Sequence, residues 1–199
     1  FEVRAGEADD FTRLFGSLME GEQPTHFIHC WSVDMADPLD QSLGSQSALH
    51  LMQKIAGLEF AAPPSVCFVT RGAQMGKGRK DPAGLSVAQS PMAGMVKTLQ
   101  IECRQALVAG VDLDSRQALD SQTGKNLLGE LVAMRSRKSA ERLVMYRGGS
   151  RFVSRVQAMA SDKSRRAVPL EGAYSVVNAS TTIDSLTISP VERLVPGER

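Results

Sequence analysis

The sequence has no long hydrophobic run, no strong charge imbalance and no even set of cysteines, and each absence excludes a class of protein. No apolar stretch approaches the roughly 18–20 residues that span a bilayer, and the first residues lack the charged-then-apolar order of a secretory signal. The formal net charge of +1 gives no whole-chain argument for binding nucleic acid or a membrane surface. Three cysteines, each in or beside an apolar run, predict reduced, buried thiols in a cytoplasmic protein.

A glycine-rich phosphate loop is also missing, although its usual setting is present. The apolar residues 66–70 end at Thr70, Arg71 and Gly72, a pattern typical of a buried strand that meets a turn at the carboxyl edge of a sheet. In a dinucleotide-binding fold, closely spaced glycines near such an edge admit the pyrophosphate. The glycines at 72, 76, 78 and 84 fit neither G-x-G-x-x-G nor G-x-x-x-x-G-K-[ST].

The remaining pattern alternates strands and helices. Helices are predicted from Asp9 to Met19, over residues 49–58, from Ser90 and over residues 127–134. The Ser90 hydroxyl is expected to cap its helix, with Pro91 in the first turn. Strands are predicted over 26–31, 66–70 and 108–114. Two runs of β-formers, residues 142–147 and 151–156, flank Gly148-Gly149 and predict a hairpin. The order predicts an α/β fold, a parallel sheet flanked by helices with a hairpin at its margin. From Phe1 in place of an initiator Met we expect a chain that starts inside a longer polypeptide or after processing, of which the first is favoured.

Four motifs occur in an order that matches a known family. They are VTRGAQ at 69–74, QSPMAGMVK at 89–97 with Glu102, VDLD at 111–114 and YRGGSRFV at 146–153. The series resembles the structural subdomain of the ketoreductase region of type I polyketide synthases and animal-type fatty acid synthases. The resemblance covers roughly residues 25–157. It implies a truncated Rossmann-like, short-chain-reductase-like fold that holds no cofactor and no active site.

The C-terminal part has a different character. A charged segment, residues 162–166, precedes a predicted strand over 183–190, and TIDSLTI at 182–188 with PGE at 196–198 resembles the start of an enoylreductase domain. The expected division is therefore a ketoreductase structural subdomain at 1–158 and, at 159–199, a linker with the first strand leading to an enoylreductase.

The residues agree with the absence of catalysis that the resemblance implies. A short-chain reductase needs a Tyr with a Lys four residues later, but Ser150 follows Tyr146 and Asn178 follows Tyr174 at that spacing. We therefore expect no catalytic, cofactor-binding or metal residue in this chain, and no enzyme activity of its own. NADPH and phosphopantetheine would belong to the parent synthase.

Two clusters of polar residues are candidate sites. His26, His29 and Cys30 invite a metal interpretation, but strand alternation places His29 on the opposite face from the other two. Asp112 and Asp114 lie at the end of a predicted strand, where ligand sites gather in open sheets. A turn or helix cap is the favoured interpretation of that pair.

Two surfaces are candidates for binding partners, and for the second, a basic stripe, a solvated face is the favoured interpretation. The hairpin edge, with Tyr146, Phe152, Val153 and Val156, is predicted to dock the catalytic ketoreductase half of the same polypeptide. Arg147, Arg151 and Arg155 form a basic stripe, and the alternative function is an independent module that captures an acidic acyl carrier protein with it. No aromatic interleaving accompanies the stripe, so nucleic acid is not expected. A stand-alone enzyme with an unrecognised site near residues 72–85 is the remaining alternative.

Overall fold

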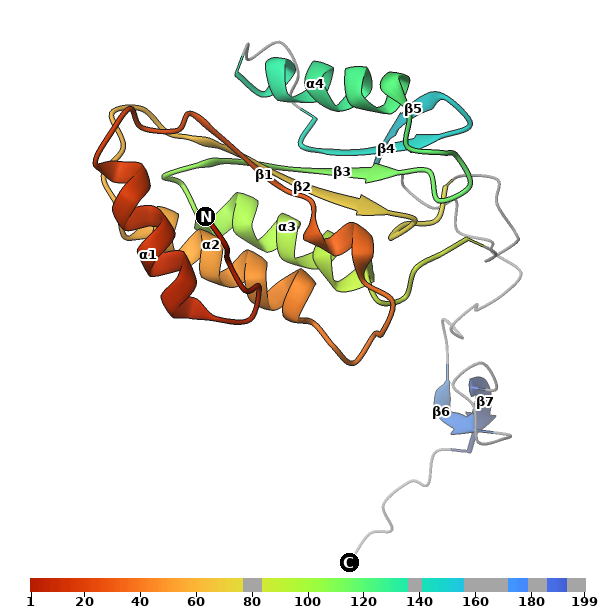
Figure 1. Cartoon of the computed structure of the whole chain (residues 1–199). Coiled ribbons are helices and arrows are strands. Elements are labelled where there is room, and N and C mark those ends of the chain that lie inside the picture. The colour runs from red at the N-terminus through yellow and green to blue at the C-terminus, as the bar shows by residue number, and fades with distance from the viewer. Residues whose placement is uncertain (77–83, 136–140, 156–171, 179–185, 193–199) are drawn as a thin grey trace, which may run out of the picture. The chain divides into compact units, whose positions relative to one another are not determined.

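The computed structural model describes residues 1–76, 84–135, 141–155, 172–178 and 186–192 (Figure 1). Contacts divide the chain into two compact units, Phe1–Arg155 and Val156–Arg199. Each unit is described by itself. No helix in the described ranges is long and apolar enough to cross a membrane.

The first unit is built on a five-stranded sheet in the order β1-β2-β3-β4-β5. Strands β1 (His26–His29), β2 (Ser65–Arg71), β3 (Leu107–Leu113) and β4 (Leu143–Arg147) pair in parallel, and β5 (Ser150–Val153) pairs antiparallel with β4. Six of the seven residues of β2 and six of the seven of β3 are buried, as expected for central strands covered on both faces. The predicted α/β fold class is confirmed.

Helices cover the two faces unequally (Figure 1). Val66 and Phe68 of β2 point to the face that carries α1 (Ala8–Met19), α2 (Ser47–Ala56) and α3 (Ser90–Glu102). Cys67 and Val69 point to the other face, where they pack with Leu131 of α4 (Ser121–Arg135). Three helices therefore cover one face, and α4 covers the other.

This arrangement gives the crossovers different hands. The parallel strands β1, β2, β3 and β4 follow one another across the sheet in a single direction. A crossover connection over one face of the sheet therefore has the opposite hand to a crossover over the other face. The connections through α2 and α3 share one hand, and the connection through α4 has the other. The usual right-handed rule cannot hold for all three.

The predicted hairpin is confirmed. Gly148 and Gly149 have φ values of +56° and +78° between β4 and β5. Two consecutive positive φ values define the type I′ turn whose twist suits a two-residue hairpin, and glycine adopts them without steric cost.

The second unit contains a two-stranded antiparallel ribbon, β6 (Ala173–Asn178) and β7 (Leu186–Val191). The sequence predicted a strand over 183–190, of which 183–185 lie outside the described residues, and it did not predict β6. Cross-strand pairing puts Tyr174 opposite Pro190, Val176 opposite Ile188 and Asn178 opposite Leu186. One face of the ribbon is therefore mainly apolar.

Two local predictions were wrong. Cys30 is exposed rather than buried, because β1 ends at His29 and a 3-10 helix, Trp31–Asp34, begins just beyond it. The Ser90 hydroxyl does not cap α3 but donates to the Val87 carbonyl oxygen, at 2.8 Å.

Candidate functional site at the carboxyl edge of the sheet

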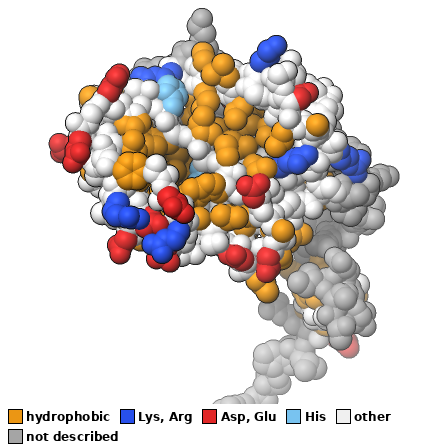
Figure 2. Space-filling model, in the orientation of Figure 1, with side chains coloured by type: hydrophobic (Ala, Val, Ile, Leu, Met, Phe, Trp, Pro, Cys, Tyr) orange, Lys and Arg blue, Asp and Glu red, His pale blue; other side chains and the backbone are white. Residues whose placement is uncertain are grey.

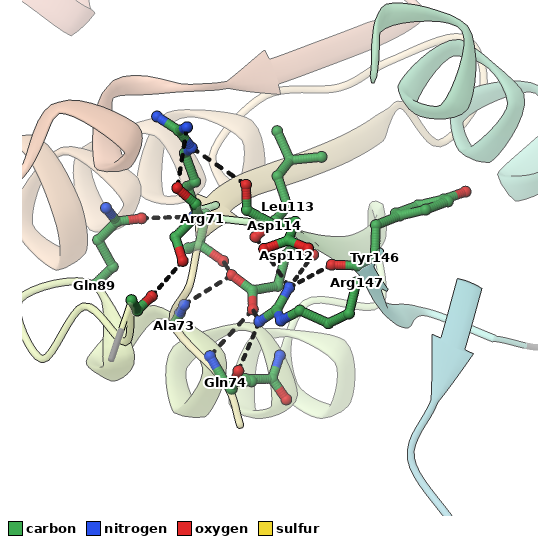
Figure 3. A network of polar contacts seen from close by, with 12 residues as sticks. Arg71, Ala73, Gln74, Gln89, Asp112, Leu113, Asp114, Tyr146 and Arg147 are labelled. Carbon is green, nitrogen blue, oxygen red and sulfur yellow. Dashed lines mark hydrogen bonds and ion pairs between the residues drawn. The ribbon is translucent and has the colours of Figure 1, made fainter. Parts of the chain in front are cut away.

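The carboxyl ends of β2, β3 and β4 meet at one edge, where an open α/β sheet binds its ligand. Strand alternation places Thr70, Asp112 and Arg147 on the face that carries α3, because Phe68, Val108 and Leu143 lie on that face at even spacing. The register pairs Thr70 directly with Asp112. The side chains of Asp112 and Arg147 converge at this edge (Figure 3), and the Thr70 hydroxyl binds Asp112.

Asp112 is the centre of the network, and its side chain is 1% exposed. Its Oδ1 accepts hydrogen bonds from the Thr70 hydroxyl at 2.7 Å and the Ala73 backbone N–H at 2.9 Å. Its Oδ2 accepts from the Gln74 backbone N–H at 3.1 Å and forms an ion pair with Arg147. The carboxylate thus takes the backbone donors of the turn after β2, which in a dinucleotide fold would face an anionic ligand.

Arg147 is also buried, at 7% exposed, and it supplies the countercharge. Its Nη1 donates to the carbonyl oxygens of Asp112 at 3.1 Å, Leu113 at 3.0 Å and Tyr146 at 2.6 Å. Its Nη2 donates to the Gln74 carbonyl oxygen at 2.6 Å. A charge this deep is tolerated because its partner and several carbonyl groups surround it.

Gly72 closes the same edge by packing. Its φ is +78°, and a Cβ at this position would lie 2.5 Å from the Gly84 carbonyl oxygen. Its carbonyl oxygen accepts from the Ser86 backbone N–H at 2.8 Å. This glycine, which fits neither phosphate-binding motif, admits the chain's own backbone at the edge.

Asp114 forms the turn that was predicted for the acidic pair. Its Oδ1 accepts from the Arg116 backbone N–H at 3.0 Å, as in an Asx turn, and its Oδ2 accepts from the Gly148 N–H at 2.8 Å. Asp112 behaves differently, since it lies within β3 and anchors the neighbouring strand ends.

The predicted basic stripe is three separate ion pairs. Arg147 pairs with Asp112, Arg151 with Glu130 of α4, and Arg155 with Glu141. Arg147 is buried and cannot present its charge to a partner, and the other two are each bound to a carboxylate. The pairs were missed because Glu130 and Asp112 lie 21 and 35 residues from their arginines in the sequence.

The residues of the predicted interface have different environments. The Tyr146 hydroxyl donates to Glu130 Oε1 at 2.5 Å, and Arg151 binds both oxygens of the same carboxylate. Burial, and then the hydrogen bond to Glu130, raise the pKa of Tyr146 to about 12. Phe152 is 37% exposed, Val153 is half-buried, and Val156 lies outside the described residues.

Tyr146 is therefore unsuited to proton donation, because its hydroxyl is bound to a carboxylate and its pKa is raised. Burial alone would raise the pKa of Glu130, but the hydrogen bonds from Arg151 and Tyr146 outweigh it and lower that pKa. No group of three or more metal-ligating side chains occurs among the residues that the structure describes.

No protein-family model matches the sequence, and no curated protein is significantly similar to it. Similarity appears in structure. A multidomain structure of adenylation, ketoreductase and pseudo-Asub from a keto acid-selecting NRPS module matches 85% of this chain with a TM-score of 0.65 and 19% identity. A structure of A-type ketoreductases from a modular polyketide synthase matches 87% with a TM-score of 0.62 and 21% identity, and an A1-type ketoreductase matches 87% with a TM-score of 0.60 and 22% identity.

These matches establish the fold, which is the Rossmann-like fold of ketoreductase structures. The chain spans 14% of the first structure and 34% of each of the other two. It therefore corresponds to about a third or less of those chains.

Proposed function

We propose that this chain is the non-catalytic structural half of a ketoreductase region in a polyketide-synthase-type assembly. It docks and positions a catalytic reductase half, which carries NADPH and reduces a β-keto group. The chain itself supplies no catalytic residue and binds no cofactor.

The observation that carries this proposal is the closed carboxyl edge. The Asp112 carboxylate already accepts the backbone N–H groups of Ala73 and Gln74, so an anionic phosphate there would meet a negative charge, and these two donors are already taken. The strand order among the described strands also has no reversal, and a ligand crevice in open sheets forms at such a reversal.

The docking surface that we propose is the outer edge of β5. It is the last strand of the sheet, so one side of its backbone has no neighbouring strand among the described residues. Phe152, 37% exposed, and the half-buried Val153 lie on this strand beside the open edge. An edge with apolar side chains suits strand-to-strand or loop-to-strand contact with a second domain.

The ribbon β6–β7 supports a continuation into a further β-rich domain, which we propose is an enoylreductase. Tyr174 is 46%, Val176 62% and Leu186 42% exposed on its apolar face. A two-stranded ribbon of this kind is at best marginally stable in water, and additional strands or a packed layer stabilise it.

An immunoblot of the source cells, with an antibody raised to this chain, tests the proposal directly. A band many times heavier than 21.5 kDa that co-purifies with NADPH-dependent ketoreductase activity is expected. A band near 21.5 kDa would mean a free-standing protein and would overturn it. The variant Val153→Asp, made in that heavier polypeptide, then tests the docking edge: we expect lower NADPH-dependent ketoreductase activity, and unchanged activity would exclude β5.

A further inference from the structure

Helix α4 has two apolar faces, and only one of them packs against the sheet. Leu131, at 7% exposed, packs in the core with Leu127 and Met134. Leu128 and Val132 are 61% and 63% exposed. A helix with one packed face needs only one apolar stripe, so the second stripe requires a separate explanation.

The exposed stripe has the spacing of a helix-packing seam. Lys125, Leu128, Val132 and Arg135 follow one another at intervals of three, four and three residues, which places them in one row. We name these four residues the α4 seam. Gly124 and Gly129 lie next to it, and a Cβ at either would have no heavy atom within 4 Å. The helix backbone is therefore open to close approach along the seam.

The seam lies on the flank of α4 away from the hairpin. Glu130 is on the hairpin flank, where it binds Tyr146 and Arg151. Figure 2 shows hydrophobic side chains spread from the α4 side of the first unit across the region of β1, with Lys, Arg, Asp and Glu at the margins. Ile28 of β1 pairs in register with Cys67, which faces α4, so Ile28 lies on the same face of the sheet, and it is 47% exposed.

The charges of the seam determine which partner fits. Lys125 and Arg135 are exposed, and within the described ranges neither forms an ion pair. The spacing of the seam is symmetric, so a second copy would bring like charges together whether the helices ran parallel or antiparallel. Repulsion between these like charges disfavours pairing with a second copy of α4. A partner helix with carboxylates at the matching positions would instead be attracted to Lys125 and Arg135.

We propose that the α4 seam is a docking site for an amphipathic helix of a partner protein, with two apolar residues at the centre and an acidic residue at each end. The two apolar residues of the partner helix cover Leu128 and Val132. The two helices cross at the small interaxial angle typical of helices that pack through residues spaced three and four apart. The terminal carboxylates bind Lys125 and Arg135 and set the register. The site is separate from the β5 edge, so its failure leaves the proposed function standing.

The test uses the full chain and a fluorescein-labelled, stapled helical peptide of about 15 residues. The peptide carries Glu, Leu, Leu and Glu at the spacing of the seam among alanines and glutamines, and fluorescence anisotropy measures binding. We expect a Kd of about 10–100 µM. Lys125→Glu/Arg135→Glu should weaken binding about tenfold or more, and a peptide with Lys in place of both Glu residues should restore it.

Matched controls make each outcome decisive. Lys97→Glu/Arg104→Glu makes the same change in net charge on and just after α3, on the other face of the sheet, and should leave the Kd unchanged. Leu128→Ser/Val132→Ser should abolish binding while circular dichroism stays that of the parent chain. Absence of binding at about 1 mM peptide, or equal binding by the seam and α3 variants, would overturn the proposal.

Discussion

The carboxyl edge of the sheet and the outer face of α4 differ in how far their charged and apolar side chains are buried. At the edge, Asp112 and Arg147 are buried and bound to each other and to backbone groups. On α4, Lys125 and Arg135 are exposed beside apolar side chains that nothing in the described unit covers. The edge pairs its charges within the chain, whereas the α4 seam is the surface on which we propose that a partner docks. Substitutions at the edge should therefore change stability, and those on α4 should change association.

The largest expected effect is at the edge. Asp112→Asn leaves the buried Arg147 cation without its countercharge and should lower the free energy of unfolding by about 3–5 kcal/mol. Urea denaturation measures the loss. The double variant Asp112→Asn/Arg147→Met should recover a large part of it, because it removes the uncompensated charge. A single variant as stable as the parent would refute the closed-edge description.

His29 extends the comparison to a buried group that forms no ion pair among the described residues. Burial lowers the pKa of His29 to about 4, and its Nε2 lies 2.7 Å from the Ser47 hydroxyl oxygen. The unfolded chain binds a proton below about pH 6.5. Stability is therefore present above that pH and is lost as the pH falls toward 4, by about 3 kcal/mol in all.

Urea midpoints measured from pH 7.5 to 4.5 check this prediction. His29→Gln should flatten the decline between pH 6.5 and 4.5, and His26→Gln, at an exposed position, should leave it in place. An identical pH profile for parent and His29→Gln would exclude His29 as the cause.

A smaller difference in stability is expected between the ion pairs Arg151–Glu130 and Arg155–Glu141. Glu130 is 9% exposed and accepts from Tyr146 and Arg151, so Glu130→Gln should cost about 1–2 kcal/mol. Glu141→Gln, at the more exposed pair with Arg155, should leave the midpoint unchanged within error. Thermal melting of both variants measures the difference, and a larger loss for Glu141→Gln would contradict the order.

The smallest expected effect is on α4. Leu128→Ser/Val132→Ser should change the free energy of unfolding by no more than about 0.5 kcal/mol, since both side chains are exposed. Leu131→Ala on the buried face should cost about 2–5 kcal/mol. Denaturant titrations compare the two, and a large loss for the seam variant would mean that these residues stabilise the unit itself.

Local pattern was sufficient for most of the fold and for little of the site. The apolar periodicity of α1 and the Gly148-Gly149 turn are local signals, and both predicted the observed elements. Strand β6 was missed because its partner β7 lies beyond a stretch without local strand signals. The five apolar residues over 127–134 do not reveal that they divide between two faces of α4, since that depends on where the sheet lies.

The ion pair at the carboxyl edge could not be predicted either, because it also depends on how distant strands pair. Arg147 looked like one cation of a surface stripe, and only the pairing of β3 with β4 brings it to Asp112. One signal in the sequence was available: Thr70 and Asp112 each lie at the end of a predicted strand, and parallel strand ends meet. No comparable signal pointed to the arginine.

The buried ion pair between Asp112 and Arg147 also disfavours an incorrect register between strands β3 and β4. A slip of one residue between β3 and β4 would turn Arg147 to the face that carries α4, away from Asp112. The guanidinium would then be buried without its carboxylate, at a cost of about 3–5 kcal/mol, comparable to much of a small domain's stability. Asp112 and Arg147 thus penalise the incorrect alignment more than they strengthen the correct one.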